Sequence, residues 1–473
     1  MPTRNTYVVL IAIVVSLFCH QVFRTVKSAS VVGQAIDLIN RDYYREVNEK
    51  ELLDAAMVGV VSGLDPFSEY LTVDKYQDLQ DDMKQEFAGI GILVDQPEEN
   101  QPVRVVTPLV GSPALQAGLM PNDFIIAVDQ SDVSASNLDE VSEKLRGEAG
   151  STVEVVVRRG DDEKEVQVQR ARIAMESVVG DYRDEQNHWV FRLQSHPEIA
   201  YVRVKKFGEK TVSELQTIFQ QLDSSCEGLV LDLRDNGGGL LDSACVICDM
   251  FLEKGDIVST RDRSGNVDEM VRATPGTEVP ADLPMAILIN QNSASASEIV
   301  AACLQDHQRA LIVGSRSFGK GTVQQVIPLE YGRSALRLTI ARYFRPSGVN
   351  IHREKEFKDD DIWGVTPSEG FEIPLTDEEI IILGTRWRDA SFPFLTTMLQ
   401  ESDPPNQDAP SDGSSPSNAE DTAEESDQQV AEPDLRKLSD SKKAPELDYD
   451  PHLRAAVIVS ESRCAQGSAC SHL

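Results

Sequence analysis

The chain has 473 residues, of which 41% are hydrophobic and 26% charged, so it is long enough for two or three domains with ordinary cores. Its formal net charge of −33 argues against nucleic acid or an anionic lipid surface as a partner, because both are negatively charged. The seven cysteines show no repeating framework and leave the redox compartment open. Cys245 and Cys248 form one C-x-x-C pair in an apolar run, which indicates core packing rather than zinc. Cys464 and Cys470 could pair in an oxidising compartment.

An unbroken apolar run, Tyr7–Phe18, stands near the N-terminus behind Arg4. The run is at the short limit for a membrane span and also fits the core of a signal peptide. Arg4 and the terminal amine favour a cytoplasmic N-terminus. We therefore interpret residues 1–27 as a membrane anchor or signal segment. We expect it to be retained, with the rest of the chain outside the cytoplasmic membrane, on the periplasmic side. Residues 28–75 are predicted to be helical.

A glycine-rich loop, Gly89-Ile90-Gly91-Ile92, opens a series of short apolar runs that continues through Val103–Val106 and Phe124–Val128. The series resembles a PDZ domain that ends near Arg172, and the loop matches the carboxylate-binding loop of that fold. The resemblance implies that backbone amides hold a peptide C-terminus while its last residues add a strand to a sheet edge. The two isoleucines suggest an apolar pocket for the terminal side chain. A β-bulge without a ligand is the alternative for this loop.

Farther along, Leu229–Leu233 reads as a buried strand, followed by the loop Arg234-Asp235-Asn236-Gly237-Gly238-Gly239. Glycines permit close backbone approach, so their amides can point at a ligand oxygen. A tight turn between a strand and a helix is the alternative interpretation. Asp232 and Asp235 are expected to cap the strand end and the loop rather than to act as acid–base catalysts.

The run Asn292-Ser293-Ala294-Ser295-Ala296-Ser297-Glu298 places hydroxyl groups between a predicted strand, Pro284–Asn290, and a predicted helix, Glu298–Gln305. Ser295 and Glu298 fit the capping box S-x-x-E, which satisfies free amides at a helix start without any catalysis. A helix start also supplies N–H groups that can stabilise an oxyanion, so both interpretations can hold together. The residues alone do not select among the three serines.

Lys320 stands between two glycines in Phe318-Gly319-Lys320-Gly321-Thr322-Val323-Gln324, just after the apolar run Ala310–Gly314. A lysine can take the proton of an attacking serine if burial lowers its pKa. The segment matches a phosphate-binding P-loop up to the lysine, but Gly321 stands where Ser or Thr should bind magnesium. A strand rather than a helix is predicted next, which disfavours the nucleotide interpretation. A Ser-His-Asp enzyme would need His307 or His352, and neither lies in such a motif.

These segments, in this order and together with Arg345-Pro346-Ser347-Gly348, resemble the carboxy-terminal processing peptidases, also called tail-specific proteases. The resemblance covers roughly residues 31–394. It implies that Ser295 is the nucleophile, Lys320 the general base and Gln324 the side chain that orients the base. It also implies an oxyanion hole built from the amide of Gly237 or Gly238 and that of Ala296. No metal or other cofactor is implied.

Between Glu401 and Asp450 the chain has 15 acidic and 4 basic residues and is rich in proline and serine, a composition that cannot bury a core. We predict a disordered acidic insertion at 396–449. Asp450-Pro451 then reads as a helix start. The helix that follows is expected to return to the enzyme within a C-terminal part at 450–473.

The predicted fold is a multidomain α/β arrangement with N-terminal helices. A PDZ module of the β-sandwich or barrel kind at 76–172 precedes an α/β protease core at 173–395 with a mixed central sheet. The predicted function is a serine endopeptidase that cuts proteins near free C-termini captured by the PDZ domain. The alternative is a PDZ adapter at the membrane, either catalytically silent or an enzyme that inhibits itself.

Overall fold

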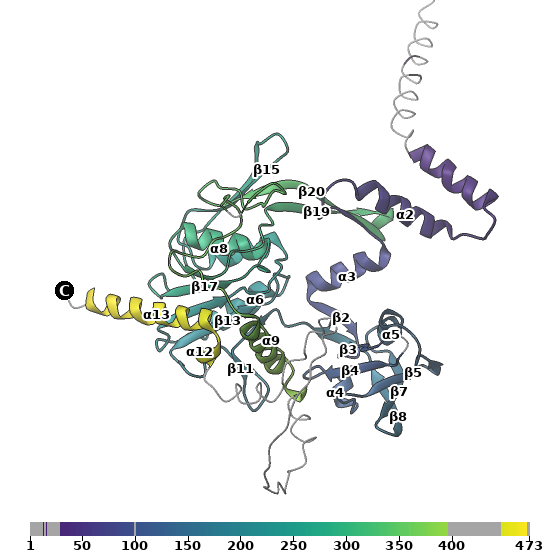
Figure 1. The fold of residues 1–473 in the computed structure, drawn as a ribbon, viewed down its shortest axis with the longest axis horizontal. Helices are drawn as coiled ribbons and strands as arrows, with labels where there is room; N and C mark the ends of the chain where they lie inside the picture. The colour runs from purple at the N-terminus through teal and green to yellow at the C-terminus, as the bar shows by residue number, and fades with distance from the viewer. Residues whose placement is uncertain are drawn as a thin grey trace, which may run out of the picture. The chain divides into compact units, whose positions relative to one another are not determined.

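The computed structural model describes Ile13, Ser16 and residues 29–98, 101–358, 360–395 and 446–470. It divides into two compact units, residues 1–80 with 322–341 and residues 81–321 with 342–473 (Figure 1). Apart from Ile13 and Ser16 of the predicted anchor and residues 446–449 of the predicted acidic insertion, both segments lie outside the described residues, as do the side chains of Cys464 and Cys470. No helix in the described ranges is long and apolar enough to cross a membrane.

The first unit contains helical residues 29–42 and a set of short elements. These are α2 (Glu49–Val61), β1 (Glu69–Leu71), α3 (Val73–Lys84), β19 (Thr322–Leu329), the 3₁₀ turn η1 (Glu330–Gly332) and β20 (Ser334–Phe344), with α3 and β20 continuing into the second unit. β1 pairs antiparallel with the first half of β20. The Asp65 carboxylate caps the turn before β1 by accepting the N–H of Phe67 at 2.8 Å and of Ser68 at 3.0 Å. Thr339 of β20 also donates to it, at 3.1 Å, so this carboxylate joins the turn to the strand.

The second unit begins with the predicted PDZ domain. Its elements are β2 (Glu86–Gly89), β3 (Ile92–Asp95), β4 (Val103–Pro108), α4 (Pro113–Gln116), β5 (Phe124–Val128), β6 (Ser131–Asp132), α5 (Leu138–Leu145), β7 (Thr152–Arg159), β8 (Asp162–Gln169) and β9 (Ala171–Ala174). The main sheet has the order β3-β4-β5-β7-β8, so β3 is an edge strand. Alternate residues of β7 (Val153, Val155 and Val157) are fully buried, as the two-residue period of a half-buried strand requires.

The predicted protease core is built on a second sheet with the order β10-β13-β14-β17-β18, formed by β10 (Val178–Val179), β13 (Ile199–Val204), β14 (Gly228–Asp232), β17 (Met285–Ile289) and β18 (Leu311–Gly314). β10 is antiparallel to β13 and the other pairs are parallel, so the sheet is mixed, as predicted. The connecting helices are α6 (Thr211–Phe219), α7 (Leu241–Asp249) and α8 (Ala296–Asp306). The remaining elements are β11 (Tyr182–Arg183), β12 (Trp189–Val190), β15 (Asp256–Arg261), β16 (Val267–Arg272), α9 (Asp377–Ser391), α12 (Glu446–Tyr449) and α13 (Pro451–Cys470).

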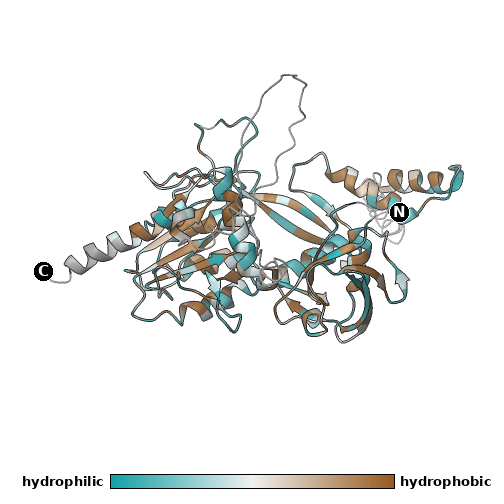
Figure 2. Cartoon of the chain, turned by 60° about the horizontal axis from the view of Figure 1, so that its bottom comes forward, coloured by the Kyte–Doolittle hydropathy of each residue, from teal (hydrophilic) through white to brown (hydrophobic). Residues whose placement is uncertain are grey.

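Helix α13 covers one face of this sheet (Figure 1). Leu453, Ala456 and Val457 form one cluster with strand residues such as Val230 and Leu288. The residues that alternate with these along the strands, such as Leu229, Leu231 and Ile287, are equally buried and face the side of α8. The strands are therefore apolar on both faces. Figure 2 accordingly shows the strands of the central sheet as mainly hydrophobic. The predicted return of the C-terminal helix to the enzyme is confirmed.

The buried side chain of Arg234 links α13 to the sheet. Its guanidinium donates to Asp232 at 2.6 Å and to Asp450 through two hydrogen bonds of 2.9 Å. Arg234 is 1% exposed, and both carboxylates are fully buried. Burial alone would raise the pKa of the Asp232 carboxyl, but the positive charge of Arg234 outweighs it and holds that pKa below its ordinary value. Arg234, Asp232 and Asp450 are called the buried triad below.

We predict that Asp450→Asn lowers the free energy of unfolding by about 1.5–3 kcal/mol, because it replaces the charge-assisted hydrogen bonds between Arg234 and Asp450 by neutral ones while Arg234 keeps its pairing with Asp232. Urea unfolding followed by tryptophan fluorescence measures the loss. The matched control is Asp256→Asn, which breaks a solvent-exposed pair with Arg272 and should cost under about 1 kcal/mol. Equal, small losses in the two variants would show that the buried triad does not hold α13 in place.

A second prediction concerns pH. His452 of α13 is 1% exposed, and its Nε2 is 2.7 Å from the Ile373 carbonyl oxygen. Burial, reinforced by the charge of Arg234, lowers the pKa of His452. Below pH 6.5 the unfolded chain therefore binds a proton at His452 more readily than the folded chain does. The free energy of unfolding consequently decreases as pH falls below about 6.5. We expect His452→Gln to flatten this loss, and urea unfolding between pH 7.5 and pH 5 tests it. An identical pH slope in both proteins would contradict the prediction.

Candidate active site

Ser295 lies at the turn that joins β17 to α8, in the position that caps the helix. Its backbone has φ 56° and ψ −114°, a conformation that residues with a side chain seldom adopt. Such a conformation costs on the order of 1–3 kcal/mol and persists only where the surroundings fix it. Here the Ser295 N–H donates to the Glu298 carboxylate at 2.8 Å, which fixes the turn against the first turn of the helix. Ser295 is 5% exposed.

The other two serines of the triplet have their hydroxyls committed to the main chain. Ser293 Oγ donates to the Leu233 carbonyl at 2.8 Å, and Ser297 Oγ donates to the Asn236 carbonyl at 2.9 Å. Both serines are fully buried. Their role is therefore to tie the β17–α8 turn to the glycine-rich loop that follows β14.

Glu298 joins this turn to the lysine loop. One of its oxygens, Oε2, accepts the N–H of Ser295 and the N–H of Lys320, both at 2.8 Å. The other, Oε1, accepts the N–H of Gly319 at 2.7 Å and the hydroxyl of Ser317 at 2.5 Å. Burial raises the pKa of Glu298, and these four donors oppose that rise. The peptide nitrogens of the predicted nucleophile and base thus meet on a single carboxylate oxygen.

The two positions beside Lys320 have no room for a side chain, so both require glycine. A Cβ on Gly319, whose φ is +86°, would lie 2.9 Å from the Trp363 ring, and one on Gly321 would lie 2.3 Å from the His352 nitrogen. The lysine loop therefore packs closely against the 352–363 segment. Lys320 itself is half-buried, and strand β19 rather than a helix follows it, so the structural context of a P-loop is missing.

The glycine-rich loop reaches the β17–α8 turn from the end of β14. A Cβ on Gly238 would lie only 2.8 Å from the Ser295 Cβ and 3.0 Å from the Ala296 nitrogen. The Gly238 N–H donates to the side chain of Asn236 at 2.8 Å, so it would have to leave Asn236 to meet an oxyanion. Gly237 lies next to it in the same loop. The structure therefore brings both predicted segments of the oxyanion hole together around Ser295.

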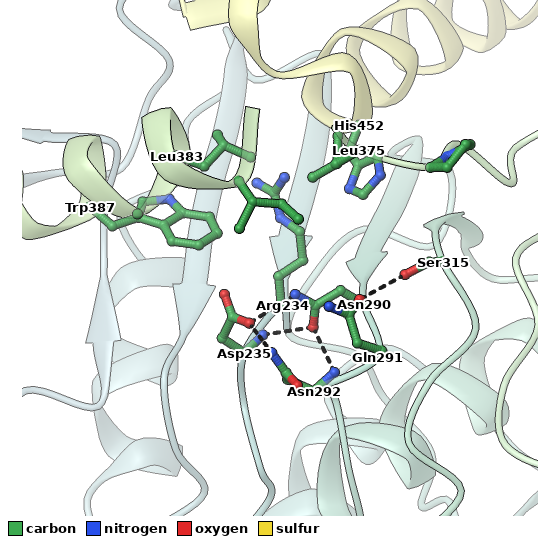
Figure 3. A pocket seen from close by; sticks show the side chains of 13 residues that line it. Arg234, Asp235, Asn290, Gln291, Asn292, Ser315, Leu375, Leu383, Trp387 and His452 are labelled. Carbon is green, nitrogen blue, oxygen red and sulfur yellow. Dashed lines mark hydrogen bonds between the residues drawn. The ribbon is translucent and has the colours of Figure 1, made fainter. Parts of the chain in front are cut away.

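Behind these loops, on the side of α9 and α13, lies a cavity of about 330 Å³ (Figure 3). Its floor is a hydrogen-bond network in which Asp235 Oδ1 accepts the side-chain amides of Asn290 and Asn292, at 2.9 and 2.8 Å. Asn290 Oδ1 in turn accepts the N–H of Asp235 at 3.0 Å. This network is a second connection between the glycine-rich loop and the β17–α8 turn. Asp235 therefore acts as a loop-capping group.

Gln324 belongs to the first unit, in β19. Its side-chain amide donates to the hydroxyls of Thr322 at 2.8 Å and Thr339 at 3.3 Å. Its role toward Lys320 stays a prediction. His307, one of the two histidines considered as a base, has Nε2 2.8 Å from the carbonyl oxygen of Asp256, a main-chain contact.

In the PDZ domain, the carbonyls of Ile90 and Gly91 accept the N–H groups of Ala114 at 2.9 Å and Leu109 at 3.0 Å. In a trans peptide the carbonyl and the following N–H point in opposite directions. The N–H groups of Gly91 and Ile92 therefore point away from the 109–114 segment. Ile90 is buried in the PDZ core, and Ile92 packs against that core. The loop opens directly into the edge strand β3.

Three features of the site were not predicted from the sequence. Glu298 was assigned only to the capping box, and its bonds to the lysine loop have no local signal. The pairing of Arg234 with Asp450 joins residues 216 positions apart. The bond from Gly238 to Asn236 depends on a side-chain rotamer, although asparagine two residues before a glycine is typical of such local bonds.

Comparison with known proteins identifies three matching family models. Peptidase family S41 matches residues 198–368, the PDZ domain matches 104–159, and the N-terminal domain of the activating protease CtpB matches 20–75. A carboxy-terminal-processing protease of Bartonella bacilliformis is 37% identical over 375 residues, covering 78% of this chain and 81% of that protein. A probable CtpA-like serine protease of Staphylococcus haemolyticus is 33% identical over 323 residues, covering 68% of this chain and 62% of that protein.

Among solved structures, a photosystem II D1 C-terminal processing protease is 27% identical, with a TM-score of 0.41, covering 72% of this chain and 92% of that one. The sequence relationship with the Bartonella protein extends over more than two thirds of both chains. It agrees with the order of PDZ domain and protease core described above. This chain therefore belongs to peptidase family S41, the C-terminal processing serine proteases, and carries a PDZ domain.

Proposed function

We propose that this protein is an endopeptidase that uses Ser295 as nucleophile and Lys320 as general base. The observation that carries the proposal is the shared Glu298 oxygen, which holds the peptide nitrogens of both residues. Ser295 Oγ attacks the substrate carbonyl while its proton passes to the neutral Lys320 amine. The lysine returns that proton to the leaving amine, and it then activates the water that releases the acyl group. Gln324 orients the lysine.

Two features favour Ser295 over its neighbours. The hydroxyls of Ser293 and Ser297 are occupied by main-chain carbonyls, and both residues are fully buried. Ser295 is in the strained conformation that places a side chain at a helix N-terminus, next to the amides of Ala296 and the glycine-rich loop. Those amides would stabilise the oxyanion, with Gly237 as the glycine donor or Gly238 after release from Asn236.

We further propose that the PDZ domain delivers the substrate. The N–H groups of Gly91 and Ile92 are directed toward a terminal carboxylate, and the edge strand β3 pairs with the last residues of the bound tail. Ile92 contributes to the pocket for the terminal side chain. Substrates are accordingly unstructured proteins with apolar free C-termini, met outside the cytoplasm where the N-terminal segment holds the enzyme at the membrane.

One observation favours a self-inhibited resting enzyme as the alternative. The Gly238 N–H is bonded to Asn236 in this conformation, so that potential oxyanion donor is unavailable until the loop changes. Binding of a substrate tail would then have to favour the conformation in which the Gly238 N–H is released from Asn236. An activity that rises more than linearly with tail concentration distinguishes this enzyme from one that is always active.

We predict that Ser295→Ala and Lys320→Ala each lower the rate of degradation of an unstructured protein with an apolar C-terminus by at least about 10³-fold. Ser293→Ala and Ser297→Ala are the matched controls. Ser297→Ala removes one hydroxyl-to-carbonyl bond, and Ser293→Ala removes such a bond and the acceptor of the Asn290 N–H. The two variants should cost about 1 and about 2 kcal/mol of stability while retaining activity within roughly 10-fold. Full activity in Ser295→Ala would refute the assignment of the nucleophile.

We also predict that a substrate with an amidated C-terminus is cut with a kcat/KM roughly 10- to 100-fold below that of the free acid, because hydrogen bonds from the loop amides to a charged group are lost. The comparison uses two peptides that differ only at the terminal group. The acid and the amide also differ by one negative charge. As a control for net charge, a second pair of substrates carries the acidic residue inside the tail, away from the end. Equal rates for acid and amide would remove the argument for carboxylate capture.

A further inference from the structure

A row of hydrogen-bonded side chains in the first unit ends at Gln324. The side-chain nitrogen Nε2 of Gln324 donates to the hydroxyl oxygens of Thr322 at 2.8 Å and Thr339 at 3.3 Å. The Thr339 hydroxyl donates in turn to Asp65 Oδ1 at 3.1 Å. Gln324 lies on β19, Thr339 on β20 and Asp65 in the turn before β1, so three segments of the first unit meet here. Asp65, Thr339 and Gln324 are called the polar row below.

The Asp65 end of the polar row is fixed by several donors. Oδ1 also accepts the N–H groups of Phe67 and Ser68, and Oδ2 accepts the Ser68 hydroxyl at 2.6 Å. The Ser68 oxygen itself accepts the Thr339 N–H at 3.1 Å, so the main chain of Thr339 is attached to the same turn. Burial alone would raise the pKa of the Asp65 carboxyl, but these donors outweigh burial and hold that pKa below its ordinary value. The carboxylate is therefore ionised at neutral pH.

The negative charge of Asp65 sets the direction of each bond in the row. An ionised carboxylate can only accept hydrogen bonds, so the single proton of the Thr339 hydroxyl points at Asp65. Toward Gln324 that hydroxyl can then offer only a lone pair. The amide must therefore turn its NH₂ group to Thr339, because the opposite orientation would set two acceptors against each other. The carbonyl oxygen Oε1 of Gln324 consequently points away from Thr339.

We propose that Thr339 and Asp65 are positioning residues for the active site, which fix the Gln324 amide so that its carbonyl oxygen is the group presented to the base. This inference rests on the proposed role of Gln324 toward Lys320. A lysine amine carries N–H groups in both its protonated and its neutral state, so a carbonyl oxygen can accept a hydrogen bond from it in either state.

The orientation of the amide matters because a general base works through its lone pair. The neutral Lys320 amine has one lone pair, and in the proposed mechanism this pair takes the proton of Ser295. A flipped Gln324 amide would present N–H groups to the amine and could occupy that lone pair. By holding the NH₂ group on the side of the threonines, the polar row keeps the lone pair of the base available.

Thr339→Val in the full chain tests the proposal, because it keeps the branched shape of the side chain and removes the hydroxyl. With an unstructured protein that has an apolar C-terminus as substrate, we expect kcat to fall roughly 10-fold with KM changed less than about twofold. The amide then lacks one of its two acceptors and can flip. Thr339→Ser keeps the hydroxyl and should retain kcat within about threefold.

A double-mutant cycle with Gln324→Ala shows whether Thr339 acts through the glutamine. Gln324→Ala alone should lower kcat roughly 10- to 100-fold. Adding Thr339→Val should lower it less than about twofold further, because no amide is left to orient. Falls that multiply would overturn the positioning role in favour of a structural one. Asp65→Ala should also lose most of its effect on kcat in the Gln324→Ala background, and it decides the question if Thr339→Val does not fold.

The matched control is Thr274→Val. The Thr274 hydroxyl also donates to a carboxylate, Asp249 Oδ2, at 2.7 Å, and it lies in the second unit. Thr274→Val therefore removes the same kind of bond and should keep the wild-type kcat. Equal falls of kcat in Thr274→Val and Thr339→Val, matched by equal falls in Tm, would show that both act through stability and would overturn the inference.

The single variants separate this inference from the proposed function. If Gln324→Ala lowers kcat and Thr339→Val keeps the wild-type value, the inference about the polar row is wrong and the proposed mechanism stands. If Gln324→Ala or Lys320→Ala is fully active, the proposed mechanism is wrong at that residue, and the role of the polar row falls with it.

Discussion

The Glu298 carboxylate is the interaction on which the candidate active site depends. It is fully buried, and a buried carboxylate without donors is strongly unfavourable. Its donors come from two separate loops, the nucleophile turn after β17 and the lysine loop after β18. Neither loop can withdraw without leaving the carboxylate uncompensated. The geometry between the proposed nucleophile Ser295 and the proposed base Lys320 is therefore set by the main chain, and the long Lys320 side chain does not have to define it alone.

The buried triad plays the corresponding role on the other face of the sheet. A buried ion pair gains little over well-packed apolar residues, because removing the charges from water offsets their attraction. Its effect is on specificity instead: after Asp232 has bound one side of the Arg234 guanidinium, further N–H groups still need acceptors, and Asp450 at the start of α13 accepts two of them. Since Arg234 also begins the glycine-rich loop, the return of the distant C-terminal helix and the position of Gly238 have a common anchor.

Local patterns in the sequence were sufficient for several strands and for the helix start at Ser295, because these follow from residue spacing, whereas the order of domains came from the resemblance to known families. β17 lies within one residue of the predicted strand ends, and β5 and β18 occupy the apolar runs Phe124–Val128 and Ala310–Gly314, the latter without its first residue. The unpredicted contacts share a different physical origin. Asp450 reaches Arg234, and Tyr343 reaches Gly321, only after the sheet has brought distant segments together. Choosing among the three serines likewise needed the carbonyls of Leu233 and Asn236, which no local pattern reveals.

The strain at Ser295 connects these observations. A glycine would relieve the left-handed conformation, yet it would remove the hydroxyl, so the strain has to be balanced by the surroundings. Glu298 supplies a hydrogen bond to the strained residue itself, and the absence of a side chain at Gly238 supplies the room. Helix capping and catalysis are therefore not competing interpretations of S-x-x-E. The Glu298 carboxylate stabilises the strained conformation of Ser295, the proposed nucleophile. By also binding the Lys320 N–H, it makes that conformation and the position of the proposed base depend on each other.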